Sequence, residues 1–107
     1  MNKSEEEKIR WAHSPGKGKM RVVCVWKDNT DYAREVTDWM TEFKRETGKD
    51  VESLNPESVE GEIFVRARDM LQFPSIVAIA NDGSVLHEWK GTPLPQFDEV
   101  LYYIKEI

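Results

Sequence analysis

The sequence of 107 residues contains one cysteine, Cys24, so no disulfide can form within the chain and a zinc site of four cysteines is excluded. It also lacks any run of the roughly 20 apolar residues that span a bilayer. Residues 1–10 are charged throughout and carry no apolar stretch typical of a signal peptide. We therefore expect a soluble, cytoplasmic protein whose fold is held by packing alone.

Positive charge is scarce, because 15 lysines and arginines face 20 aspartates and glutamates, for a formal net charge of -5. This balance disfavours binding to nucleic acid and to anionic membranes, so we expect neither as a partner. The apolar content of 39% suffices for one modest core, and the length for one domain.

Motifs for cofactor binding and catalysis are absent as well. The basic stretch 16–19 has two glycines but lacks the Ser/Thr and the following helix of a phosphate-binding loop. The two histidines, His13 and His87, have no evident nucleophile with which to form a triad. Asp28 and Asp31 lack the spacing of a calcium loop, and we interpret them as helix-capping residues. The sequence thus predicts no catalytic residue, no metal and no cofactor.

Residues 1–19 are predicted to form a flexible tail, because Ser14–Lys19 is rich in glycine and interrupted by a proline. A helical turn around Ile9, Trp11 and Ala12 that docks on the domain is the alternative. Residues 20–107 form the predicted domain.

The domain opens with Val22–Trp26, an unbroken apolar run typical of a strand buried on both faces. Turn-forming and N-capping residues follow at 27–31, and an apolar stripe then predicts a helix that ends at Gly48. The stripe consists of Tyr32, Ala33, Val36, Trp39, Met40 and Phe43.

The second half repeats this alternation. Lys49–Leu54 is predicted as a strand, and Asn55 followed by proline indicates the N-cap of a second helix, which ends before Pro74. Its expected buried residues are Val59, Ile63, Ala67 and Met70 or Leu71. A tight turn between Ser75–Ala80 and Val85–Lys90 predicts a hairpin. Apolar residues at helical spacing predict a last helix over Pro95–Ile104.

The predicted order is strand, helix, strand, helix, strand, strand, helix, which favours an α/β fold with one sheet and helices on both faces. Two right-handed crossovers would make the first three strands parallel, but the second helix could instead return the chain antiparallel. Spacing leaves both topologies open.

This order resembles the glutaredoxin form of the thioredoxin fold, a four-stranded mixed sheet of the type βαβαββα. The loop after the first strand leads directly into a helix, Pro74 stands before the third strand, and a turn and Gly91 fall where that family has them. The resemblance implies a cis peptide bond before Pro74 and a substrate groove between that proline and the redox loop.

The sequence departs from the family at its chemistry. The resemblance places Thr30, Asp31, Tyr32 and Ala33 over the Cys-x-x-Cys positions, and neither end is a thiol. Cys24 lies inside the apolar strand, where we expect it to be protonated and inert. Thiol–disulfide exchange, which needs an attacking thiolate, is therefore not expected.

The resemblance also implies a binding site near the vacated loop. Its residues would be Trp26, Thr30, Asp31, Tyr32, Phe73 and Pro74. We interpret the protein as a redox-inactive binding or accessory module that takes a peptide or a partner protein beside Pro74. Two alternatives stay open: a glutathione-linked enzyme acting through Cys24, and a module that oligomerises through its sheet edge or an aromatic patch.

Overall fold

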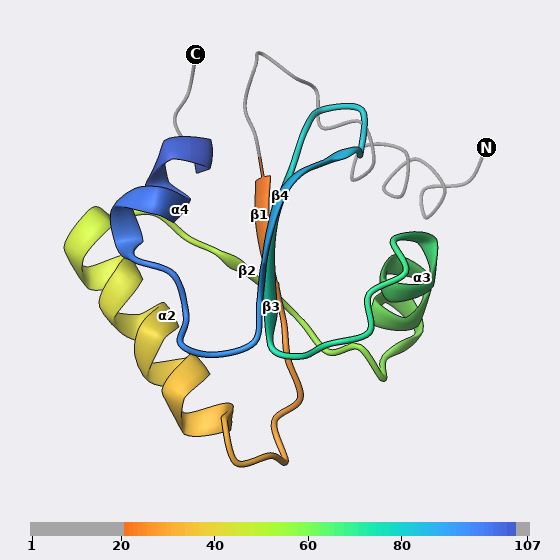
Figure 1. The fold of residues 1–107 in the computed structure, drawn as a ribbon. Helices are drawn as coiled ribbons and strands as arrows, with labels where there is room; N and C mark the ends of the chain where they lie inside the picture. Colours follow the sequence, from red (N-terminus) through yellow and green to blue (C-terminus); the bar gives the residue numbers. More distant parts are fainter. Residues whose placement is uncertain (1–20, 105–107) are drawn as a thin grey trace, which may run out of the picture.

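The computed structural model describes residues 21–104, which contain four strands and three helices (Figure 1). In chain order these are β1 (Arg21–Val25), α2 (Ala33–Thr47), β2 (Glu52–Leu54), α3 (Val59–Ala67), β3 (Ser75–Ile79), β4 (Val85–Lys90) and α4 (Phe97–Ile104). The predicted tail over residues 1–19 and its alternative lie outside the described residues, as does the exact start of the domain.

The strands form one mixed sheet in the order β2-β1-β3-β4. β1 pairs parallel with β2 and antiparallel with β3, and β3 pairs antiparallel with β4. The second helix therefore returns the chain antiparallel, which decides the topology that spacing left open. α2 and α4 cover one face of the sheet and α3 the other (Figure 1). The predicted α/β class, with a four-stranded mixed sheet between helices, is confirmed.

The larger core lies between the sheet and the helices α2 and α4. Alternate residues of β1 and β3 point into it, which is why both strands are apolar throughout. Its buried members are Val22, Cys24, Val36, Phe43, Ile76, Ala78, Val100 and Ile104. Trp39 stacks on Phe43 with ring centroids 5.1 Å apart, and Phe97 meets both rings edge-on. Phe43 is buried and the other two rings are packed against this core.

The second core lies under α3, and here the predicted helix face was wrong. The buried residue is Phe64, with 2% of its surface exposed, whereas Ile63 is 61% and Val59 79% exposed. Ala67 is exposed too. Of the two alternatives at the end of the helix, Met70 is buried and Leu71 is 93% exposed.

Gly61 gives the physical reason for this rotation of α3. A Cβ atom on Gly61 would lie 1.7 Å from the carbonyl oxygen of Asn55, so only glycine fits against the turn that precedes the helix. Gly61 and Phe64 are three residues apart and lie on the same face of the helix. The contact of Gly61 with the turn therefore also turns Phe64 toward the core. The aliphatic stripe through Val59 and Ile63 is left outside.

The helix starts also differ from prediction. Ser58, and not Asn55, is the N-cap of α3, and its hydroxyl accepts a hydrogen bond from the N–H of Gly61. Asn55 instead accepts from the N–H of Glu57 and so closes the preceding turn. At α2 the N-cap is Tyr32, which makes no side-chain cap, so the capping role expected for Asp28 and Asp31 is wrong.

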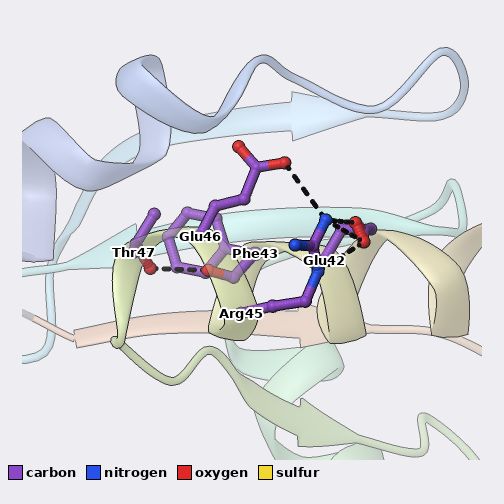
Figure 2. Close-up of polar contacts among 5 residues, drawn as sticks. All are labelled: Glu42, Phe43, Arg45, Glu46 and Thr47. Atoms are coloured by element: carbon purple, nitrogen blue, oxygen red, sulfur yellow. Dashed lines mark hydrogen bonds and ion pairs between the residues drawn. The ribbon is translucent and has the colours of Figure 1, made fainter.

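The end of α2 agrees with prediction, because Gly48 is its left-handed C-cap and donates its N–H to a carbonyl of the last turn. Near the C-terminal end of this helix, polar side chains bond to neighbours on the same helix (Figure 2). Arg45 donates to Glu42 at 2.8 Å, lies 3.8 Å from Glu46, and lowers the pKa of Glu42 through that hydrogen bond. The hydroxyl of Thr47 donates to the carbonyl of Phe43 at 2.7 Å.

Candidate functional site

Two loops meet at one end of the sheet, and together they hold every site residue predicted from the sequence. Val25, the last residue of β1, is paired with Ser75, the first residue of β3. The residues after Val25 and those before Ser75 therefore emerge side by side. We call residues 26–32 and 72–74 the loop cluster.

The first loop is held by its own hydrogen bonds. The N–H of Lys27 donates to the hydroxyl of Tyr32 at 2.9 Å, and the hydroxyl of Thr30 donates to the carbonyl of Lys27 at 2.9 Å. The N–H of Ala33 then bonds to the carbonyl of Thr30 at 3.3 Å and leads into α2. Asp31 stays exposed. The loop that would carry a redox motif is thus closed by a tyrosine and a threonine.

Trp26 is fixed against β2 at two points. Its backbone N–H donates to the carbonyl of Leu54 at 3.1 Å, and its indole N–H donates to the hydroxyl of Ser53 at 2.7 Å. Because the backbone N–H and the indole N–H are both hydrogen-bonded, the partly buried indole ring is held in one orientation.

The second loop is anchored by the hairpin that follows it. Pro74 is fully buried, and its carbonyl accepts the N–H of Gly91 at 2.7 Å. The hydroxyl of Ser75 donates to the carbonyl of Gln72 at 2.6 Å. The peptide bond between Phe73 and Pro74 is cis. Among residues 21–104, neither the N–H nor the C=O of Phe73 has a hydrogen-bond partner.

The three aromatic side chains of the loop cluster lie at one end of the sheet but on its two faces. Trp26 and Tyr32 pack against the core under α2 and α4, whereas Phe73 packs with Leu54 and Val65 against the core under α3. Strand alternation explains this, because Trp26 follows Cys24 by two residues and Phe73 precedes Ser75 by two. Within the described chain no stacked or edge-on ring pair forms among these three residues.

The connection across the sheet end is a lysine. The ammonium nitrogen of Lys27 lies 5.7 Å from the centre of the Phe73 ring, within the range of a cation–π contact, and 3.8 Å from a carboxylate oxygen of Glu57. Sequence reasoning missed Lys27 and also Ser53, since their roles depend on which strands are neighbours. No local signal in the sequence could have identified either.

The only thiol of the chain is remote from solvent. Cys24 has 0% of its surface exposed, and burial raises its pKa from 9.0 to about 12. Its location in the apolar strand is as predicted. At the start of α2, Thr30 and Ala33 offer a hydroxyl and a methyl group, neither of which forms a nucleophile at neutral pH.

Residues 21–104 contain no group of three or more histidine, cysteine, aspartate or glutamate side chains placed to hold a metal ion. In the same part of the chain, no helix is both long and apolar enough to cross a bilayer.

No protein-family model and no curated protein matches the chain. Solved structures match its fold at low identity. A chain from a study of thiol resolution in yeast mitochondrial 1-Cys peroxiredoxin has a TM-score of 0.65 and 11% identity, with 95% of this chain and 89% of that one covered. A mutant thioredoxin from Halobacterium salinarum has a TM-score of 0.64 and 14% identity, with coverages of 100% and 89%. Thioredoxin f2 from Chlamydomonas reinhardtii has a TM-score of 0.64 and 8% identity, with coverages of 92% and 86%. This chain therefore has a thioredoxin-like fold, with its one cysteine buried inside β1.

Proposed function

We propose that this protein is a redox-inactive binding module, and that its loop cluster takes an extended segment of a peptide or a partner protein. The observation that carries the proposal is the backbone of Phe73. Its N–H and C=O have no partner among residues 21–104, although the residues on either side of it are bonded.

A free N–H and C=O on one residue match the two hydrogen bonds that an extended chain exchanges with a strand residue opposite it. The site is also rigid enough to bind without much ordering cost. The carbonyl of Pro74 is held by Gly91 and that of Gln72 by Ser75, so the residues on both sides of Phe73 are fixed before a partner arrives. The rings of Trp26 and Phe73, both partly buried, would supply the apolar contact.

The redox-inactive part of the proposal is supported by the state of the thiol. Attack on a disulfide needs a thiolate that can reach the substrate, and Cys24 is buried with a pKa of about 12. The alternative, a glutathione-linked enzyme acting through Cys24, would require β1 to open. We expect background rates in insulin-reduction and glutathione-linked assays, and a rate that disappears in Cys24→Ala would contradict this reading.

Binding can be tested by capture from cell extract with the full chain as bait. The variant is Phe73→Ala, and the matched control is Leu71→Ala in the same loop, whose side chain is 93% exposed. We expect a specific partner that is retained by the control and lost by Phe73→Ala. Tyr32→Ala is a poorer choice, because it removes the hydroxyl that holds Lys27 and would disturb the loop.

The backbone part of the proposal has a direct readout. The minimal segment of the captured partner is titrated into nitrogen-15-labelled protein, and the amide resonance of Phe73 is followed. Donation of that N–H to the partner should move this resonance further than that of Leu71. A binding partner that leaves the Phe73 amide unmoved would place the site elsewhere.

A further inference from the structure

The outer edge of β4 is an edge of the sheet that pairs with no other strand in the described chain. β4 is the last strand in the order β2-β1-β3-β4 and pairs with β3 alone. The bond from the N–H of Gly91 to the carbonyl of Pro74 fixes the phase of this ladder, so Trp89 and His87 direct their backbone groups toward β3. The backbone groups of Glu88 and Lys90 therefore point outward, and no residue in the described chain pairs with them.

This edge carries charged side chains, which often discourage pairing, but it lacks a proline and a bulge at its centre. No proline interrupts β4, and the irregularity in its ladder lies near its start, between the partners of Ala78 and Ile79. The side chains alternate in a defined way. Glu88 lies opposite Val77 and so faces the α3 side, as does Lys90, whereas Trp89 lies on the α4 side with its ring 5.6 Å from that of Tyr103.

In one antiparallel register, the charged side chains at this edge lie opposite side chains of the other sign in a second copy of the chain. When two β4 strands pair around Trp89, Glu88 of each copy lies opposite Lys90 of the other, in the positions whose backbone groups point outward. Two opposite-charge pairs then flank the two tryptophans on neighbouring rungs. Shifting the centre to Glu88 would instead place two carboxylates opposite each other, which is unfavourable.

We propose that β4 is a self-association edge, and that its occupant is a second copy of this chain paired antiparallel around Trp89. The two sheets would join into one sheet of at least eight strands, with Glu88 and Lys90 exchanging backbone and side-chain contacts across the two-fold axis. This site is separate from the loop cluster and does not depend on the proposed function.

The first test uses sedimentation velocity over a concentration series at low salt. The wild type should show a monomer–dimer equilibrium. Lys90→Glu, which places like charges opposite each other in both pairs, should weaken the dimer at least about tenfold. The swap Glu88→Lys with Lys90→Glu should restore it. A wild type that stays monomeric at every concentration overturns the proposal, even if β4 pairs with some other extended chain. A dimer whose affinity is unchanged by Lys90→Glu overturns it as well.

The second test reads the register. Glu88→Cys and Lys90→Cys proteins are mixed under mild oxidation; Lys90 is exposed and Glu88 is half-buried. The register sets residues 88 and 90 of the two copies about 5.5 Å apart between Cα atoms, within disulfide range, whereas equal positions lie beyond about 7 Å. We expect the mixed disulfide dimer to exceed either homodimer. Equal yields, or a dominant homodimer, would refute this register.

Discussion

Raising the pH should destabilise this protein through one buried group, the thiol of Cys24. Its pKa is 9.0 ordinarily and about 12 in the folded chain, because burial penalises the thiolate. A folded pKa above the unfolded one means that the folded state binds the proton more tightly. The stabilising contribution is therefore complete below about pH 9 and is lost as the pH rises from there toward 12.

The magnitude follows from the two pKa values. Each pH unit between them removes about 1.4 kcal/mol from the free energy of unfolding, so roughly 2 kcal/mol is lost at about pH 10.5. This is a large part of the roughly 5–15 kcal/mol that holds a small domain together. Lysine and tyrosine side chains titrate in the same range, so the effect must be isolated by a difference.

The assay is urea unfolding of wild type and Cys24→Ala at pH 7 and at about pH 10.5. The variant loses the titrating group but leaves the charged surface unchanged, so the gap between the two stabilities should shift by about 2 kcal/mol in favour of the variant as the pH rises. A thiol reagent should react with the wild type only as it unfolds. A gap that stays constant with pH, or a native thiol that reacts at the rate of a free one, would refute the reasoning.

Three further predictions follow from the packing and the loop. Gly61→Ala should lower the free energy of unfolding by about 2 kcal/mol or more, because its Cβ would lie 1.7 Å from a backbone oxygen; a thermal melt equal to wild type would contradict the contact. Phe64→Ala should lower the free energy of unfolding, measured in urea, by about 3–5 kcal/mol, and Ile63→Ala by less than about 1 kcal/mol. A larger loss for Ile63→Ala would mean that the helix face expected from the sequence is the buried one. Thr30→Cys with Ala33→Cys should form a disulfide under mild oxidation, measured by loss of free thiol, and failure to form it would count against the placement of the vacated motif.

The sequence predicts the order of elements well because each is marked locally. The apolar runs that became β1 and β3 are both buried throughout, and the glycine at position 48 ends α2 as expected. The direction of β3 could not be read in this way. It depends on the path of the chain through α3, and that path leaves no periodic signal in the residues themselves.

The face of α3 shows how two local signals can compete. Val59 and Ile63 draw one apolar stripe, and Phe64 lies on another, so periodicity alone permits either rotation. The deciding contact is between Gly61 and the turn at Asn55, which is a steric fact of the folded chain. A glycine inside a helical pattern is itself the clue, since it marks a place where a backbone comes close.

The residues of the loop cluster could be named from the resemblance, but their arrangement could not. The sequence gives no sign that the phenol of Tyr32 would hold the backbone of Lys27 or that Ser53 would hold Trp26. Each bond joins groups whose meeting depends on loop conformation or strand order. Sequence reasoning therefore named the residues of the candidate site but missed the hydrogen bonds that hold them in place.

The two faces of the loop cluster rest on separate cores, and this has a consequence for how the site can change over generations. Trp26 and Tyr32 are supported by the core under α2 and α4, and Phe73 by the core under α3, with the sheet between them. Substitutions on the two sides should therefore have nearly additive effects on stability. Under the proposed function, an exchange at residue 73 would change the binding surface while the loop at 26–32 keeps its conformation, so binding preference would change without the fold being rebuilt.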